Sequence, residues 1–221
     1  MFEEDREIRE LSEFGKPVQS PAARPADEAV LFGIDQIEQS IPDRFEKIAR
    51  LYPHRIAVKT EEAAVTYAEL NAMSNRVARS ILAERPGDPE PVGLFFKNGI
   101  AQIVCMLGVL KAGKFFVLLD PSFPKDRIAI ILEDSQATLM LTDQRNIAVA
   151  RQAADPGCRI VEFESIGDRV AGQDLGLRIS PKALAHIIYT SGSTGRHKGV
   201  VQNHVNQLHF VMRTTNADRV S

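Results

Sequence analysis

Residues 189–199 read Tyr-Thr-Ser-Gly-Ser-Thr-Gly-Arg-His-Lys-Gly, and the apolar run Ala-His-Ile-Ile-Tyr at 185–189 leads into them. Glycine lacks a Cβ, so the glycines allow tight turns in which backbone N–H groups point toward a bound anion. The hydroxyl groups add hydrogen-bond donors, and Lys198 adds a positive charge on a long stem. The run therefore predicts a loop that binds the phosphates of a nucleoside triphosphate. The residues that we assign to it are Thr190, Ser191, Gly192, Ser193, Thr194, Gly195 and Lys198.

Two other interpretations fit this run less well. A Walker A loop needs Gly-Lys-Ser/Thr at its end, whereas the order here is Lys-Gly-Val at 198–200. A flexible Gly/Ser linker is normally flanked by polar residues and not by an apolar run such as 185–189. We expect instead that residues 185–189 and 199–202 are strands on either side of the loop, followed by a helix from about Asn203.

Upstream of this region, apolar runs of strand length alternate with segments of helical periodicity. The expected strands are 92–96, 115–119, 138–142 and 159–163, and the expected helices are 41–51, 100–111, 127–132 and 147–154. Alternation of this kind is typical of parallel sheets with helices on their faces. The sequence therefore predicts an α/β fold with layered, parallel-rich sheets.

Local signals mark where single elements begin and end. Thr66 and Glu69 have the spacing of a capping box at the start of a helix that continues to about residue 82. Gly113 fits the end of the helix at 100–111, because glycine has no Cβ clash there. For Asp120 and Arg127 we prefer hydrogen bonding in a turn or at a helix start over a part in catalysis.

Three segments, in this order, resemble the signature motifs of the adenylate-forming superfamily, which includes acyl-CoA synthetases, luciferases and the adenylation domains of nonribosomal peptide synthetases. They are the helix motif at 65–82, the LKAG…DP…P…RI motif at 110–128 and the phosphate loop at 189–199. The second motif is most similar to the amino-acid-activating branch. His197 stands where most members carry proline, so we expect a less stiff backbone just before Lys198.

The resemblance implies that residues 41–221 are the N-terminal part of an AMP-binding adenylation domain. Residues 1–40 are charged, interrupted by prolines and without sustained periodicity, so we expect a lead or linker there. The complete enzyme would use ATP and Mg²⁺ to activate a carboxylic acid, by resemblance an amino acid, as an acyl-adenylate. The acyl group would then pass to the thiol of a carrier protein's phosphopantetheine or of CoA. In relatives the metal-ligating acid lies beyond the position of Ser221, so we expect the chain alone to be inactive. The alternative is an inactive remnant that acts as a nucleotide-binding or synthetase-docking module.

His204 lies where the superfamily commonly keeps a histidine shortly after the phosphate loop. The resemblance implies that its imidazole contacts the activated carboxylate or a phosphate oxygen. A histidine at a helix start that meets backbone or solvent is an equally good interpretation. Zinc binding is disfavoured because His204 and His209 are five residues apart with no acidic residue between them.

Composition excludes several classes of function. Lys and Arg number 27 against 29 Asp and Glu, so no charge excess favours nucleic acid or an anionic membrane. The two cysteines, Cys105 and Cys158, have no metal-ligand spacing, and we expect both to be reduced. No apolar stretch reaches membrane-spanning length, and the acidic start is unlike a secretory signal. We therefore expect a cytoplasmic location.

Overall fold

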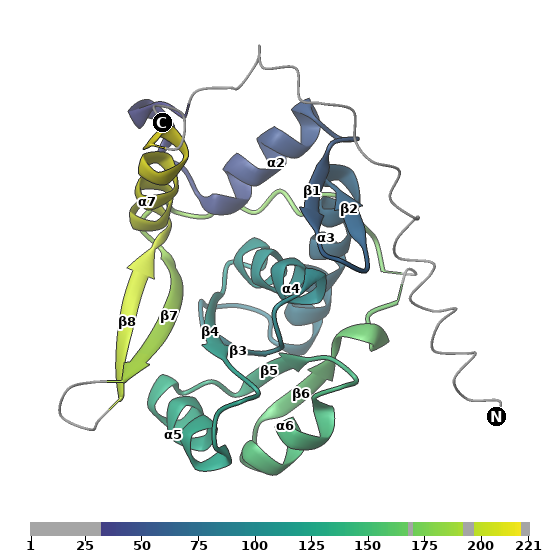
Figure 1. The fold of residues 1–221 in the computed structure, drawn as a ribbon, viewed down its shortest axis with the longest axis vertical. Coiled ribbons are helices and arrows are strands. Elements are labelled where there is room, and N and C mark those ends of the chain that lie inside the picture. Colours follow the sequence, from purple (N-terminus) through teal and green to yellow (C-terminus); the bar gives the residue numbers. More distant parts are fainter. Residues whose placement is uncertain (1–31, 168–169, 192–196, 218–221) are drawn as a thin grey trace.

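The structure is a computed structural model, and it describes residues 32–167, 170–191 and 197–217. Its main feature is a six-stranded sheet (Figure 1). From one edge to the other the strands are β6 (Arg159–Glu162), β5 (Leu139–Thr142), β3 (Pro91–Phe95), β4 (Phe115–Leu119), β7 (Leu184–Ser191) and β8 (His197–Asn203). All neighbours pair in parallel except β7 and β8, which pair antiparallel. The parallel-rich α/β fold predicted from the alternating pattern is confirmed.

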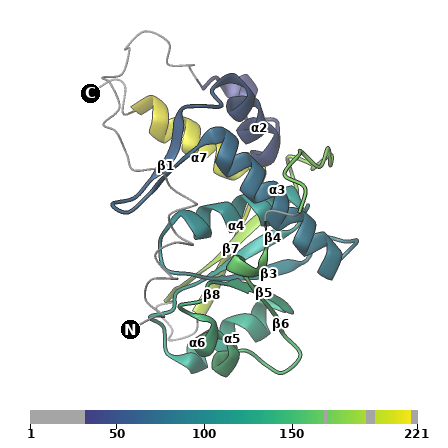
Figure 2. The ribbon, with the colours of Figure 1, turned by 90° about the vertical axis from the view of Figure 1, so that its right-hand side faces the viewer.

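Helices cover both faces of this sheet. Figure 2 shows α3 (Tyr67–Glu84) and α4 (Ile100–Lys111) on one side of the strands and α5 (Lys125–Ser135) and α6 (Ile147–Ala153) on the other. Each face has its own apolar core, one packed against α3 and α4 and one against α5 and α6. Strands buried on both faces are apolar along their whole length, which is why 92–95 and 139–141 read as continuous apolar runs.

The predicted helix boundaries follow from local hydrogen bonds. The Thr66 hydroxyl accepts a hydrogen bond from the Glu69 N–H at 3.2 Å, and the Glu69 carboxylate accepts one from the Thr66 N–H at 2.7 Å, which confirms the capping box. Gly113 follows α4 with a φ of 71°, a conformation that favours glycine. α2 (Ile41–Leu51) begins with a second capping box, formed by Ser40 and Asp43.

Two parts of the fold were not expected from the sequence. β1 (Ile56–Lys59) and β2 (Ala64–Thr66) form a separate antiparallel pair just before α3. Residues 32–40, which the sequence assigned to the lead segment, include a short 3₁₀ helix, η1 (Ile34–Gln36), and bury Phe32 and Ile37 against α7 (His204–Ala217). Packing in the described structure therefore begins before Ile41.

The remaining described element is a second 3₁₀ helix, η2 (Phe163–Ser165), directly after β6. Within residues 32–167, 170–191 and 197–217, no helix combines the length and apolar character needed to span a bilayer.

A buried ammonium group joins four segments of the chain. The Lys111 side chain is 1% exposed, and its Nζ donates to Glu46 Oε1 at 2.6 Å and to the Oδ1 atoms of Asn71 and Asn75 at 2.7 Å each. Both asparagines in turn donate to the Asp174 carboxylate, at 2.8 and 3.0 Å. Burial lowers the pKa of Lys111, and the Glu46 carboxylate opposes that shift. All three protons of the ammonium group thus tie α4 to α2 and α3, and the two asparagines extend the network to the segment around Asp174.

We expect Lys111→Met to destabilise the fold by about 3–5 kcal/mol, because the substitution leaves the Glu46 carboxylate without its buried partner. The measurement is the free energy of unfolding from urea titration. Lys59→Met is the matched control, since Lys59 lies exposed on β1. If both substitutions cost the same, the Lys111 network does not contribute to stability in the way its geometry indicates.

Candidate functional site

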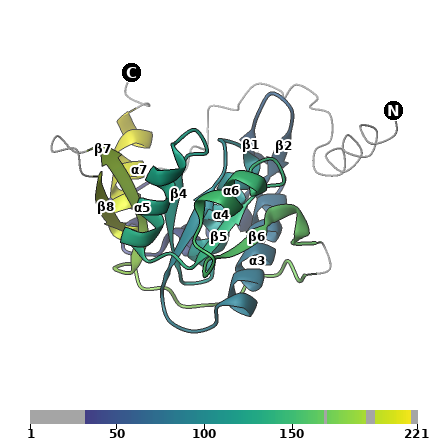
Figure 3. The same ribbon diagram turned by 90° about the horizontal axis from the view of Figure 1, so that it is seen from below.

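The residues predicted to form the phosphate loop fall, in the sequence, at and between the facing ends of β7 and β8, the two strands that form a ribbon at one edge of the sheet. Figure 3 shows this ribbon beside α5 and α7, with β6 and α3 at the other side of the molecule. β7 ends at Ser191 and β8 begins at His197, and these two residues are paired. The loop residues Gly192, Ser193, Thr194 and Gly195 lie outside the described residues, and Ser191 is described only as part of its strand.

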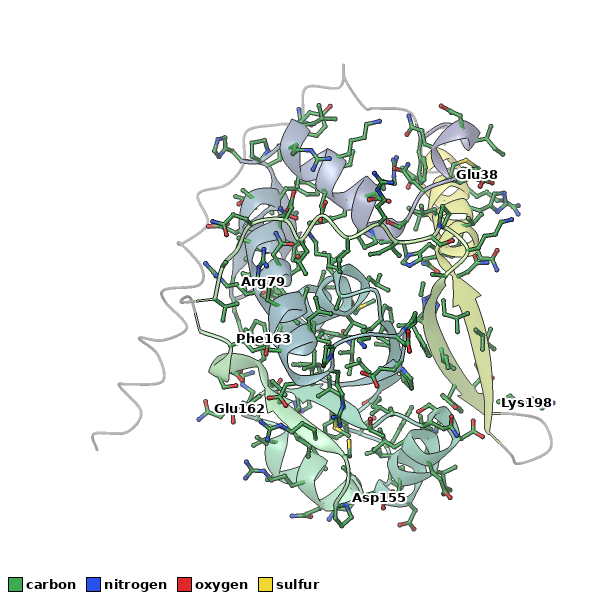
Figure 4. The ribbon with its side chains drawn as sticks, turned by 180° about the vertical axis from the view of Figure 1, so that it is seen from behind. Glu38, Arg79, Asp155, Glu162, Phe163 and Lys198 are labelled. Carbon is green, nitrogen blue, oxygen red and sulfur yellow. The ribbon has the colours of Figure 1, made fainter. Side chains whose placement is uncertain are left out.

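Two of the predicted loop residues are cross-strand partners. Thr190 pairs with Lys198 one position before the end of the ribbon, and both side chains are exposed. Directly opposite residues of an antiparallel pair extend on the same face, so the Thr190 hydroxyl and the Lys198 ammonium group share a face. Figure 4 shows Lys198 at the end of the ribbon, with its side chain pointing away from the body of the protein. This end of the ribbon therefore presents a positive charge and a hydroxyl donor to solvent.

The preceding cross-strand pair is Tyr189 and Gly199, and it faces α5. The Tyr189 ring lies close over Gly199, where an added Cβ would be 3.2 Å from the ring Cζ atom. The Tyr189 hydroxyl donates to Asp134 Oδ2 at 2.5 Å. Burial and the nearby Asp134 carboxylate raise the pKa of Tyr189 above its usual value. Sequence reasoning did not find Asp134, because it lies 55 residues from Tyr189 and no local pattern marks it.

Asp120 and Arg127 both make local structural contacts. Asp120 Oδ1 accepts a hydrogen bond from the Ser122 N–H at 2.8 Å, and this bond, helped by the charges of Arg127 and Lys97, lowers the pKa of Asp120. The Arg127 guanidinium carbon lies 3.7 Å from the centre of the Phe123 ring. The Asp120 contact is the turn hydrogen bond that the sequence favoured, whereas the Arg127 side chain, in the first turn of α5, contacts an aromatic ring in place of the expected hydrogen bond.

His204 is the first residue of α7, and it is 1% exposed. Its Nδ1 accepts a hydrogen bond from the backbone N–H of Ile41, the first residue of α2, at 3.2 Å. Burial lowers the pKa of His204 to about 4, and the neighbouring His186 contributes to the same shift. The imidazole is therefore neutral at neutral pH. Of the two interpretations left open by the sequence, the described contact is the one with backbone.

His186 lies on β7 and is also buried, with its ring stacked on Phe116 at a centroid distance of 5.3 Å. Burial lowers the pKa of His186 as well. Among the described residues, no group of three or more His, Cys, Asp or Glu side chains is placed to hold a metal ion. Cys105 and Cys158 are free thiols, and Cys105 is fully buried in α4.

A cavity of about 460 Å³ lies away from the ribbon, next to β6. Arg79 and Arg159 are among its lining residues, and Figure 4 shows Arg79 and Glu162 on the side of the molecule opposite to Lys198. Arg79 donates to the carbonyls of residues 171 and 173, and Arg159 pairs with Glu84 at 3.1 Å. Both guanidinium groups thus already have partners within the chain.

Comparison with known proteins confirms the family resemblance found in the three sequence motifs. Residues 45–220 match the family model described as AMP-binding enzyme. The chain is 36% identical over 168 residues to one of the subunits of mycosubtilin synthase from Bacillus subtilis and 34% identical over 166 residues to tyrocidine synthase 1 of Brevibacillus parabrevis. These alignments cover 76% and 75% of the chain but only 6% and 15% of the two relatives.

Solved structures show the same similarity. The nonribosomal peptide synthetase FmoA3 in its AMPPNP-bound form superposes with a TM-score of 0.68 at 26% identity, over 95% of this chain and 20% of that one. Its form bound to α-methyl-L-serine-AMP gives a TM-score of 0.69 at 25% identity, over 95% of this chain and 21% of that one. The Klebsiella oxytoca NpsA N-terminal subdomain shares the fold, with a TM-score of 0.66 at 22% identity over 76% of this chain and 42% of that one.

The buried His204 gives an expected pH dependence of stability. Its pKa is lowered in the folded state from 6.5 to about 4, so the unfolded chain binds a proton in this window that the folded chain does not. Stability should therefore fall as the pH decreases from 6.5 toward 4. In His204→Asn, whose amide oxygen can still accept from the Ile41 N–H, the loss of unfolding free energy between pH 7 and pH 4.5 should be smaller.

The measurement is urea unfolding of the parent chain and the variant at both pH values. His209→Asn, on the same helix but outside the contact with Ile41, is the control and should keep the parent's pH dependence. An unchanged pH dependence in His204→Asn would mean that the histidine is not held neutral by burial.

Proposed function

Because the chain belongs to the AMP-binding enzyme family and corresponds to the N-terminal part of a nonribosomal peptide synthetase adenylation domain, we propose that it carries the phosphate-binding half of an enzyme that activates an amino acid as an acyl-adenylate. The observation that carries the proposal is the pairing of Thr190 with Lys198 at the end of the β7–β8 ribbon. The hydroxyl- and glycine-rich residues 191–195 lie between these two positions in the sequence.

The donors on the ribbon fit the charge of a triphosphate. Lys198 is exposed, so its ammonium group is free to approach phosphate oxygens, and the hydroxyl group of Thr190 extends on the same face. In the proposed reaction ATP supplies the α-phosphorus that the substrate carboxylate attacks, and pyrophosphate leaves. Lys198 would neutralise charge on the pyrophosphate end, and the hydroxyls of the loop would orient it. Mg²⁺ would supply further neutralisation, and its ligands are not among the residues that we assign.

The substrate and the acceptor are also part of the proposal. An amino acid is supported by the peptide synthetases among the relatives and by FmoA3, which was solved with α-methyl-L-serine-AMP bound. The thiol of a carrier protein is the acceptor that fits such synthetases. Since the chain spans 6% and 15% of the two curated relatives, these steps would involve the rest of the enzyme.

A nucleotide-binding or docking module without activity is the second candidate, and one observation favours docking. β8 is an edge strand, and its residues Val200 and Val201 are 47% and 51% exposed. Val200 pairs with Ile188 of β7, which is 40% exposed. An apolar sheet edge favours association with another polypeptide surface. A completed enzyme that catalyses amino-acid-dependent exchange of pyrophosphate into ATP would support the first candidate, and one that binds ATP without exchange would support the second.

We expect Lys198→Ala to weaken binding of MgATP by about 1.5–3 kcal/mol, which is roughly 10- to 150-fold, because the substitution removes a charge-assisted contact with phosphate. Isothermal titration calorimetry on the parent chain and the variant measures the change. Lys182→Ala removes an exposed lysine before β7 begins and should leave the affinity unchanged. Equal affinity of the Lys198→Ala variant and the parent would refute the assignment of the loop.

A further inference from the structure

We propose that Tyr189, Asp134 and Gly199 form a clamp that positions the phosphate-binding end of the ribbon. The proposal rests on the function assigned above, because it concerns how Thr190 and Lys198 are held. Tyr189 and Gly199 are the cross-strand pair directly before Thr190 and Lys198, and Asp134 lies in the last turn of α5. Figure 1 shows α5 close to the lower end of the β7–β8 ribbon.

The ribbon needs such an attachment, because its pairing with the rest of the sheet ends early. β7 pairs with β4 only through Phe116 with His186 and Val117 with Ile187. From residue 188 onward, β7 has β8 as its only strand partner within the described structure. A two-stranded ribbon is marginally stable on its own. The 2.5 Å hydrogen bond from the Tyr189 hydroxyl to Asp134 ties this part of the ribbon to the body of the protein.

Gly199 allows the tyrosine ring to reach this position. A Cβ at residue 199 would be 3.2 and 3.4 Å from two atoms of the Tyr189 ring and 2.9 Å from the Ile187 side chain. The backbone at Gly199 is not among the positive-φ glycines of the described chain, so space and not conformation requires glycine here. The ring therefore crosses β8 at close range and still reaches α5 with its hydroxyl group.

The helix that holds the other end of the clamp is firmly packed. Ile128, Ile131 and Leu132 of α5 are buried against the sheet, and Tyr189 belongs to the same apolar cluster. The hydrogen bond between Tyr189 and Asp134 thus ties the ribbon to a helix that is itself packed into the core. Since Thr190 and Lys198 are each one peptide unit from a clamp residue, their side-chain directions depend on where the clamp holds the strands.

The test distinguishes the role of the Tyr189 hydroxyl group from that of its ring. It also distinguishes the role of the Asp134 charge from that of its hydrogen bond. Tyr189→Phe keeps the ring over Gly199 and removes the donor. Asp134→Ala removes the acceptor, whereas Asp134→Asn keeps an oxygen of the same shape in place. Tyr52→Phe is the matched control, because it removes a hydroxyl group from a tyrosine remote in sequence from the clamp. Amide hydrogen exchange and MgATP affinity are measured for the full chain and each variant.

We expect Tyr189→Phe and Asp134→Ala to speed exchange at residues 189–190 and 198–200 and to weaken MgATP binding roughly 3- to 10-fold, the effect of losing one net hydrogen bond. Exchange in β3 and β5 should stay at the parent's rate. Asp134→Asn should restore most of both properties, and Tyr52→Phe should change neither.

The two readouts distinguish failure of the clamp from failure of the proposed function. Unchanged exchange at the ribbon end in Tyr189→Phe and Asp134→Ala, or a uniform increase over the whole sheet, would overturn the clamp. The clamp would also be overturned if both variants bind MgATP with the parent's affinity while Lys198→Ala binds it more weakly. If the parent chain binds no MgATP and exchange still rises only at the ribbon end, the clamp stands as a positioning device and the nucleotide assignment fails.

Discussion

The buried ammonium group of Lys111 is the constraint on which the arrangement of this fold depends. A charge with 1% exposure is tolerated only where its donors are all satisfied, and here the acceptors come from α2 and α3. α2, α3 and α4 must therefore meet at one point. Since His204 accepts from the first N–H group of α2, the position of α2 also determines where α7 begins. The start of α7 is in turn the end of β8, so the effect of Lys111 extends to the base of the ribbon.

The ribbon is thus attached to both helical layers. At its base, His204 joins it to α2, which packs with α3 and α4 on one side of the sheet. Near its other end, Tyr189 joins it to α5 on the opposite side. Thr190 and Lys198 lie directly beyond the second of these points, toward the end of the ribbon. The candidate phosphate site therefore lies on a ribbon whose base and outer end are attached to different cores. Lys198 is exposed, yet the strand that carries it is held in place.

Local patterns in the sequence predicted most elements and few of the long-range contacts. Residues 100–111 and 115–119 were predicted with the observed bounds, because apolar periodicity and Gly113 are local signals. β1 and β2 were missed, since strands of three or four residues show little alternation. In the LKAG motif, Gly113 was correctly placed at the end of a helix, yet the buried Lys111 was not foreseen, because its acceptors lie 36 to 65 residues away. The candidate site was limited in the same way. The local run of hydroxyls and glycines predicted the loop, but the contact of Tyr189 with Asp134 forms only in the folded chain.

The contact between Ile41 and His204 joins residues 163 positions apart. During synthesis from the N-terminus, the strands β3 to β6 and their helices are complete long before residue 204 leaves the ribosome. Domains generally fold as they emerge, and long-range pairings form last. The first N–H group of α2 must therefore wait for its acceptor until nearly the whole described chain has been made. In a nascent chain arrested before residue 204, α2 would already be tied to α4 through Glu46 and Lys111, but the N–H group of Ile41 would still lack the acceptor that fixes the start of α2.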